Sequence, residues 1–296
     1  MAGRDPTGRV FEEQRSYLFS LAYRLLGSVS DAEDVVQEAF LRWNQDPTRD
    51  IHSPRSYLAT IVVRLCLDQL RSARAKREVY VGPWLPEPLV TTGRTDLTDG
   101  VVLRESLSFA FLLMLENLSP LERAVFVLRE VFDYDYPEIA QIVDKSEANC
   151  RQVFHRARQH LAERQTRFAS SYEQTEQITQ QFLRATTTGD VQGLLRLLAE
   201  DVVSIGDGGG KAAAALQPVR SRERVTRGLL GNLRKAPPDR IWMDEVNGQQ
   251  AIVATRAGQP YGVLLLEVQA GQVQRLYSVV NPDKLRGLHL SERTEP

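Results

Sequence analysis

The chain has 296 residues, of which 42% are hydrophobic, which is long enough for about two domains that each bury a core. Its 37 basic and 38 acidic residues give a formal charge of −1, so the total charge indicates no nucleic-acid partner. We find no apolar run that could span a bilayer and no amino-terminal signal segment, which predicts a cytoplasmic protein without membrane contact. The two cysteines, Cys66 and Cys150, lack zinc-site spacing and fit a reducing compartment, so we expect no metal and no cofactor.

The first helices are predicted from apolar periodicity and capping signals. Residues 10–26 have apolar residues at helical spacing, and Gly27 can end that helix in a left-handed cap. Ser30 with Glu33 predicts a capping box for a second helix over residues 31–43. Pro54 is expected to begin a long third helix that ends in the basic cluster at Arg71, Arg74, Lys76 and Arg77. The pattern predicts an all-helical bundle.

Residues 81–100 are predicted to be a linker. Pro83, Pro86 and Pro88 exclude regular structure there and favour an extended course. Trp84 and Leu85 are unusual for a spacer, because an exposed tryptophan in an extended segment usually has a surface to dock on. Two interpretations stay open, in which Trp84 either packs against its own domain or docks on a partner.

Three short helices are predicted between residues 119 and 161. Their start signals are Ser119-Pro120-Leu121-Glu122, Asp135 with Glu138, and Ser146. Short helices joined by tight turns are typical of the helix-turn-helix that reads DNA. The first is expected to run to about Phe132, and a basic patch extends from Arg151 to Arg167.

The last of these helices has two faces. The inward face carries Cys150, Phe154, Ala157 and Leu161 at spacings of four, three and four. The outward face carries candidate DNA contacts at Arg151, Gln152, His155 and Arg156, and Arg158 is suited by type to contact phosphates. Arginine and glutamine can bond guanine and adenine edges, whereas a solvated charged face is the alternative. The inward position of Cys150 favours a small core residue over a redox switch.

From about residue 171 the pattern changes to helices followed by strands. Helices are predicted at 172–185, 191–199 and 222–233, and strands at 202–205, 240–246, 251–256, 262–268 and 273–280. Gly, Asn or Gln residues separate the later strands, as antiparallel pairing requires. The order predicts an α+β cone, so the fold class is a multidomain protein with two all-α domains and this C-terminal cone.

Three motifs in this order resemble those of the bacterial extracytoplasmic-function sigma factors. AEDVVQEAFLRW, at 32–43, resembles the sigma-two helix that binds core RNA polymerase, and SPRSYLATIVVRLCLDQLRSAR, at 53–74, resembles the helix that melts promoter DNA. Residues 118–161 resemble sigma-four. The resemblance implies polymerase contacts at Asp34, Gln37 and Glu38, and contacts to the downstream element at Ser53, Arg55, Tyr57, Arg64, Asp68 and Arg71. For Asp34, Gln37 and Glu38 the alternative is a solvated helix face, and for Arg64, Asp68 and Arg71 it is an intrahelical ion-pair ladder.

Three further motifs resemble the group of these factors that carries a C-terminal SnoaL-like extension. They are WLPEP (Trp84, Leu85, Pro86, Glu87, Pro88), DGGGK (Asp207, Gly208, Gly209, Gly210, Lys211) and NPDKL (Asn281, Pro282, Asp283, Lys284, Leu285). The resemblance implies an interdomain, regulatory role for these residues. The expected domains are 8–78, a linker at 79–100, 101–168, and 171–296. For the glycines of DGGGK, a phosphate cradle is the alternative to a flexible loop at an interdomain contact.

The function expected from the sequence is promoter-specific transcription initiation, with core RNA polymerase and promoter DNA as partners. We expect the extension to act as a built-in regulator that replaces a separate anti-sigma factor, and the cone could hold a small ligand. One alternative is a ligand-sensing repressor that binds a palindrome as a dimer. Another is a DNA-binding domain fused to a SnoaL-like enzyme, but Asp201, Asp207 and Asp244 form no convincing catalytic set.

Overall fold

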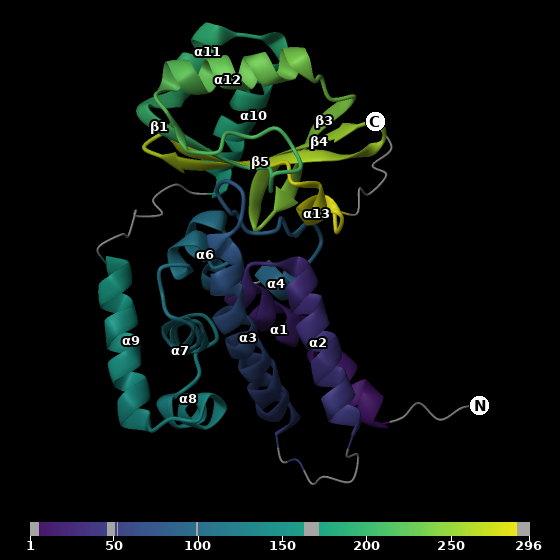
Figure 1. Ribbon diagram of the computed structural model, residues 1–296, viewed down its shortest axis with the longest axis vertical. Coiled ribbons are helices and arrows are strands. Elements are labelled where there is room, and N and C mark those ends of the chain that lie inside the picture. The colour runs from purple at the N-terminus through teal and green to yellow at the C-terminus, as the bar shows by residue number, and fades with distance from the viewer. Residues whose placement is uncertain (1–5, 46–50, 52, 99, 163–171, 289–296) are drawn as a thin grey trace, which may run out of the picture. The chain divides into compact units, whose positions relative to one another are not determined.

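The computed structural model describes residues 6–45, 51, 53–98, 100–162 and 172–288 (Figure 1). These residues form two compact units. The helical unit contains the described residues up to 78 together with 94–107 and 111–162. The C-terminal unit contains 79–93, 108–110 and 172–288. Among the described residues, no helix combines the length and apolar character needed to cross a membrane.

The predicted bundle of the helical unit is confirmed. Its helices are α1 (Pro6–Leu26), α2 (Val29–Asn44) and α3 (Pro54–Glu78). Gly27 ends α1 as predicted, with a φ of 68° and its N–H bonded to the carbonyl of Tyr23 at 2.7 Å. The predicted cap of α2 was wrong, because the Ser28 hydroxyl, not Ser30, accepts the N–H of Asp31 at 3.1 Å. Ser28 has the extended backbone of an N-cap, so the helix begins two residues earlier than predicted.

Among the described residues, six further helices follow α3 before residue 163. They are α4 (Thr95–Thr98), α5 (Val101–Glu105), α6 (Phe109–Leu115), α7 (Pro120–Glu130), α8 (Tyr136–Val143) and α9 (Glu147–Ala162). Helix α4 corrects the prediction that residues 81–100 have no regular structure. Both predicted capping boxes are present, at Ser119 with Glu122 and at Asp135 with Glu138. Helices α7, α8 and α9 form the predicted helix-turn-helix (Figure 1).

The C-terminal unit is the predicted α+β cone. Its elements are α10 (Tyr172–Thr188), α11 (Val191–Leu197), β1 (Leu198–Asp207), β2 (Val219–Arg220), α12 (Arg222–Lys235), β3 (Arg240–Val246), β4 (Gln249–Arg256), β5 (Gln259–Gln269), β6 (Gln272–Val279) and α13 (Pro282–Leu285). The sheet order is β2-β1-β6-β5-β4-β3. Strands β3 to β6 pair antiparallel as predicted, but β1 pairs parallel with β6, because the chain crosses over between them.

Both faces of this sheet are buried. Helices α10, α11 and α12 cover one face, where Phe182, Leu194, Ile252, Leu266 and Leu276 belong to a continuous apolar core. The opposite face carries Ala251, Leu265 and Tyr277, which lie side by side across three strands and are also buried. Residues 80–92, which we call the strap, run along the side of the sheet opposite α11 and α12 (Figure 1). The C-terminal unit therefore includes most of the predicted linker.

Candidate nucleic-acid interface and strap-binding site

The predicted DNA-reading face of α9 is exposed. Arg151, Gln152, His155, Arg156 and Arg158 are all exposed on this helix, whose N-terminus is capped by Ser146. The buried face carries Cys150, Ala157 and Leu161 as predicted, together with Val153, which the spacing argument missed. Phe154 is only half-buried and packs on Phe126 and Tyr136. Burial raises the pKa of the Cys150 thiol, as expected for a core residue.

Two arginines on this face rest on aromatic rings. The guanidinium of Arg151 lies 4.4 Å from the centre of the Tyr136 ring and 3.5 Å from the carboxylate of Glu147. Arg158 lies 5.9 Å from the centre of Phe154. Such contacts restrict a long side chain while its polar edge stays accessible to DNA. The side chains of Arg74, Lys76 and Arg77, and the basic residues at 163–167, lie outside the described part of the chain.

At the start of α3, the predicted promoter-melting residues also have local structural roles. The Ser53 hydroxyl caps α3 by accepting the N–H of Ser56 at 3.4 Å. Arg55 stacks on the ring of Tyr17, with its guanidinium carbon 4.0 Å from the ring centre. Tyr57 is half-buried against Trp43. These contacts hold the first turn of α3 against the bundle.

Further along α3, the three residues for which an ion-pair ladder is the alternative to DNA contacts separate into two arrangements. Asp68 and Arg71 form an ion pair at 3.0 Å, with both side chains about 70% exposed. Arg64 instead donates to the main-chain carbonyls of Ile142 at 3.2 Å and Gln141 at 3.3 Å, in the last turn of α8. The ladder interpretation therefore holds for Asp68 and Arg71, while Arg64 links α3 to the helix-turn-helix.

The predicted polymerase-binding residues lie on the outer face of α2. Asp34 and Gln37 are exposed, and Glu38 is half-buried and pairs with Arg42 at 2.8 Å. Leu41 follows on the same face and is 52% exposed. A single exposed leucine is common on protein surfaces, so the polymerase contact of this face stays a prediction.

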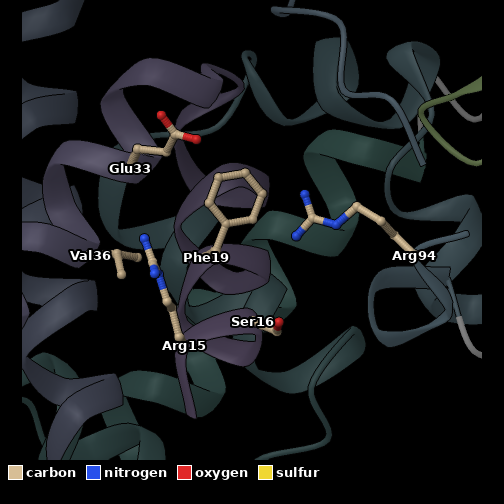
Figure 2. A pocket seen from close by; sticks show the side chains of 6 residues that line it. All are labelled: Arg15, Ser16, Phe19, Glu33, Val36 and Arg94. Carbon is tan, nitrogen blue, oxygen red and sulfur yellow. The ribbon is translucent and has the colours of Figure 1, made fainter. Parts of the chain in front are cut away.

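A pocket of about 300 Å³ lies between α1 and α2. Figure 2 shows the Phe19 ring between Val36 of α2 and Arg94, with Arg15 and Glu33 nearby. Both arginines have acidic neighbours, since Arg15 lies 3.7 Å from Glu12 and Arg94 lies 3.9 Å from Asp96. This charged lining differs from the largely apolar lining of typical small-molecule sites.

Two buried arginines that the sequence analysis missed hold the helical unit together. Arg24 of α1 donates to the carbonyls of Leu97 and Leu103 and to the Ser106 hydroxyl. Arg123 of α7 donates to the carbonyl of Leu25 at 2.8 Å and pairs with Glu116 at 2.6 Å. Burial lowers the pKa of Arg24 to about 9 and that of Arg123 to about 10, so both stay charged near neutral pH.

Asp207, at the end of β1, binds the strap through its carboxylate. The side chain is fully buried, although Asp207 is the last residue of its strand. Its oxygens accept the main-chain N–H of Leu85 at 2.8 Å, the hydroxyl of Tyr80 at 2.5 Å and the ammonium of Lys284 at 2.7 Å. Burial and the bond to Asp207 raise the pKa of Tyr80. A buried carboxylate with three donors is well compensated.

Residues of the NPDKL motif complete this site. Lys284 also donates to the carbonyl of Leu85, and its ammonium lies 4.3 Å from the centre of the Trp84 ring. Asn281 donates to the Tyr80 hydroxyl at 2.8 Å and caps α13. Trp84 therefore packs within the C-terminal unit of its own chain. The sequence alone had left open whether it packs in this way or docks on a partner.

The glycines of DGGGK allow close approach at the same site. Gly209 has a φ of 57°, and a Cβ atom there would lie 2.2 Å from the Asn281 side-chain nitrogen and 3.0 Å from the Tyr80 hydroxyl. A Cβ on Gly208 would lie 2.3 Å from the carbonyl of Ala212. Lys211 pairs with Asp283, and this bond lowers the pKa of the Asp283 carboxyl. The geometry is that of an intramolecular packing contact rather than an open phosphate cradle.

The second half of the strap pairs with the β3–β4 turn. The N–H of Leu89 bonds the side chain of Asn247 at 2.9 Å, and the N–H of Asn247 returns a bond to the carbonyl of Leu89 at 2.8 Å. The N–H of Thr91 bonds the carbonyl of Glu245 at 2.8 Å, and the Thr92 hydroxyl bonds Asp244. The strap is thus bound at Tyr80 and Leu85 by the side chains of Asp207 and Lys284, and at Leu89 and Thr91 by main-chain bonds.

Sequence reasoning missed Tyr80, Leu89 and Asn247 in this site. Tyr80 and Leu89 flank WLPEP as large side chains in a Pro-rich segment, which is the signal that singled out Trp84. Asn247 precedes Gly248 in a hairpin turn, so its second role as a strap partner has no sequence signal. Within the described residues, no three or more His, Cys, Asp or Glu side chains are grouped to hold a metal ion.

Comparisons with known proteins agree on one family over most of the chain. Residues 10–76 match the model of sigma-70 region 2, and residues 108–161 match that of sigma-70 region 4. The chain is similar to the ECF RNA polymerase sigma factor SigJ of Mycobacterium tuberculosis, at 38% identity over 96% of this chain and 94% of that protein. The crystal structure of the extracytoplasmic function sigma factor SigJ from the same species superposes with a TM-score of 0.75, at 35% identity over 93% of this chain and 96% of that one. The chain therefore belongs to the ECF family of RNA polymerase sigma factors.

Proposed function

We propose that the C-terminal unit regulates, within one chain, the transcription initiation that this ECF sigma factor directs. The observation that carries the proposal is the binding of the strap to Asp207 and Lys284. The strap lies in the sequence between the two sigma regions. A regulator on the same chain acts at an effective concentration near millimolar, so it can work without a separate anti-sigma factor.

The physical basis is the reach of the chain between α3 and α4. An extended segment spans about 3.3 to 3.6 Å per residue, so a released strap would give the two helical parts a longer range of separations. A bound strap fixes both of its ends on the C-terminal unit. The bound and released states therefore differ in how far the two sigma regions can separate. That distance matters when the two regions bind two promoter elements at the same time.

We assign the DNA and polymerase contacts by helix. The upstream element is read by α9 and the downstream element is melted by α3, while Asp34, Gln37 and Glu38 of α2 bind core polymerase. The support is the exposure of the α9 face and of the polar face of α2. We place the protein in the cytoplasm, at the nucleoid, because its partners are there. The small ligand of the cone stays a prediction.

The test is run-off transcription with sigma-free core polymerase on a library of promoters. Lys284→Gln removes the charge that holds Asp207 and leaves the family motifs of the sigma regions intact. Lys211→Gln is the matched control, because Lys211 belongs to DGGGK but pairs at the surface with Asp283. We expect Lys284→Gln to change the amount of promoter-specific transcript several-fold and Lys211→Gln to leave it near the wild-type level.

Equal output from the wild type and both variants would overturn regulation through the strap. Deleting everything after residue 168 is a less specific test, because it also uncovers Leu85 and Leu89, which are buried in the C-terminal unit. Adding the deletion to the series separates loss of the strap contact from loss of the whole unit. The direction of the change tells whether the bound strap blocks or supports initiation.

A further inference from the structure

We propose that the outer face of α12, in the C-terminal unit, binds the sugar-phosphate backbone of duplex promoter DNA. This goes beyond the proposed regulation, because it gives the unit a DNA contact of its own that does not depend on the strap. The chain is an ECF sigma factor, and sigma factors bind promoter DNA, so duplex DNA is a polyanion that the chain meets. A backbone contact adds affinity without reading the base sequence.

Basic residues are concentrated in one short stretch of the C-terminal unit. Residues 220–240 contain seven basic residues and two acidic ones, although the whole chain is nearly balanced at 37 basic and 38 acidic residues. Glu223 is the single acidic residue of α12, and it accepts bonds from Ser221 at 2.8 Å and from Arg222 at 3.2 Å. Its charge is therefore compensated within the first turn. A local excess of one charge sign attracts the opposite sign even when the net charge of the protein is close to zero.

Helix α12 places four of these cations on one exposed face. At 3.6 residues per turn, the four fall within an arc of about 100° around the helix axis. All four side chains are exposed, whereas Val225, Thr226 and Leu230 on the opposite side of α12 are buried. Figure 1 shows α12 running across the side of the sheet away from the strap. We call this surface the basic face, and its cations are Arg224, Arg227, Arg234 and Lys235.

The cations of the basic face have no acidic partner. Within the described part of the chain none of the four forms an ion pair, whereas Arg222 pairs with Glu200 at 3.5 Å and with Glu223 at 3.2 Å. Neighbouring cations repel one another, and a bound polyanion relieves that repulsion. Arg234 and Lys235 lie in the last turn, where the helix dipole favours cations. Arg224 lies in the first turn, where the dipole opposes a cation, so helix stability does not account for its charge.

Two glycines leave the main chain of α12 open between these cations. Gly228 and Gly231 lie on the basic face by the same helical spacing, and a Cβ at either position would meet no atom within 4 Å. Packing among the described residues therefore does not require glycine there, although glycine inside a helix is less stable than alanine. The missing side chains let a partner approach the helix closely between the arginines, as the projecting phosphates of DNA require.

The composition and length of the basic face favour duplex DNA over other partners. At 1.5 Å per residue, Arg224 and Lys235 are about 16 Å apart along the helix axis, which corresponds to about five phosphates of one DNA strand. All residues of this face are described, and they are arginine, lysine and glycine without an aromatic or apolar side chain. Protein hot spots, membrane surfaces and single-stranded nucleic acids are bound mainly through aromatic or apolar side chains.

The first test compares the DNA affinity of variants in the polymerase holoenzyme. The full chain is assembled with core polymerase, and the Kd for a promoter fragment with long duplex flanks is measured by fluorescence anisotropy at several salt concentrations. Arg224→Gln combined with Arg227→Gln removes two charges and keeps a similar helix propensity. We expect binding to weaken about tenfold or more near 0.1 M salt. The slope of log affinity against log salt concentration should fall in magnitude by about two.

Two control variants separate phosphate contacts from other effects. Arg224→Lys combined with Arg227→Lys keeps both charges, and lysine binds phosphate as a point charge, so the Kd should stay near the wild-type value. Arg256→Gln combined with Arg286→Gln removes two exposed charges that already contact Tyr261 and Asp283, so the Kd and the salt slope should not change. Wild-type affinity of the Arg224→Gln, Arg227→Gln variant, or equal weakening by both glutamine variants, would overturn the proposed contact.

A second measurement locates the contact without relying on affinity. Gly231→Cys is labelled with an iron chelate that cleaves nearby DNA, in the full chain, where Cys66 and Cys150 are buried. The same chelate on Arg286→Cys, an exposed position just after α13, is the control. In the promoter complex we expect cleavage of one short stretch of duplex from position 231 and none from position 286. Cleavage from both positions, or none from position 231, would contradict a contact through the basic face.

The same variants distinguish DNA from an acidic protein surface. If Arg224→Gln combined with Arg227→Gln weakens binding to core polymerase but leaves the DNA affinity of the holoenzyme unchanged, the basic face binds protein and the DNA contact fails. Regulation by the strap is tested separately, through the amount of transcript from Lys284→Gln. That regulation can fail while the Kd and the cleavage pattern still show the DNA contact, and the reverse result is equally distinguishable.

Discussion

The strap site and the contact between α3 and α8 both join segments far apart in the sequence, but they use different chemistry. In the strap site, a fully buried carboxylate meets a lysine whose side chain is 12% exposed. At α8, an exposed arginine meets main-chain carbonyls. Breaking a buried ion pair leaves an uncompensated charge, whereas water can solvate both partners of an exposed contact. The comparison indicates that the strap is held firmly and that the α3 contact is the easier one to release.

The largest effect is expected from removing the buried charge of the strap site. Asp207→Asn leaves Lys284 without its carboxylate, so we expect a loss of about 3 to 5 kcal/mol in the free energy of unfolding of the C-terminal unit. Urea unfolding followed by tryptophan fluorescence measures it. Asp201→Asn, on the same strand but exposed, should change that free energy by less than about 0.5 kcal/mol. Similar values for the two variants would contradict the buried role of Asp207.

The second largest effect is expected from the buried side chain of Leu85 in the strap. Leu85 is fully buried, so Leu85→Ala should cost about 3 kcal/mol in unfolding free energy. Val81→Ala, in the same segment but 51% exposed, is the control. In limited proteolysis, the protease should cleave the strap faster in Leu85→Ala than in the control. Equal cutting rates would mean that the segment behaves as an ordinary linker.

In the helical unit, a buried arginine and an exposed arginine can be compared directly. Arg123→Met removes charge-assisted bonds to the Leu25 carbonyl and to Glu116, and we expect a loss of about 2 kcal/mol. Arg71→Met removes an exposed pair and should cost no more than about 0.5 kcal/mol. Thermal unfolding of both variants, followed by circular dichroism at 222 nm, measures the two losses. Equal losses would contradict the structural role of Arg123.

A smaller effect separates steric fit from backbone conformation in the DGGGK loop. Gly209 and Gly189 both have positive φ, so alanine at either position is strained by about 1 to 2 kcal/mol. Only at Gly209 would the added Cβ meet another group, Asn281. We expect Gly209→Ala to cost about 1 kcal/mol more than Gly189→Ala in urea unfolding. Equal losses of unfolding free energy in the two variants would mean that Asn281 does not restrict the side chain at position 209.

The smallest effect concerns the capping box of α7 and depends on pH. Burial alone would raise the pKa of Glu122, but its hydrogen bonds to Ser119 dominate and lower it. A lowered pKa means that the ionised group stabilises the fold above the ordinary glutamate value of about 4.3, and that this stability is lost as pH falls through the folded value. Glu122→Gln should therefore lose about 1 kcal/mol at pH 7 and converge on the wild type in acid. A constant difference across pH would contradict this assignment.

Local signals determined most of the secondary structure. Two capping boxes, the Gly27 cap and the alternation of the strands were readable because each depends on residues within four positions of one another. The same local patterns predicted the exposed polar face of α9. They also contain the motifs that resemble those of the ECF sigma factors. The error at Ser28 arose because two serines in the same turn can both offer a cap, and only backbone geometry selects one.

The tertiary structure alone decided what those motifs contact. WLPEP, DGGGK and NPDKL lie far apart in the sequence, and nothing local says that Asp207 receives bonds from Tyr80, Leu85 and Lys284. Likewise, Arg24, Arg64 and Arg123 donate to main-chain carbonyls, and a carbonyl acceptor has no side-chain identity that a sequence could reveal. Periodicity predicts which face of a helix is buried. The partner of that face is chosen by packing over the whole chain, which brings distant segments together to bury apolar surface and satisfy buried polar groups.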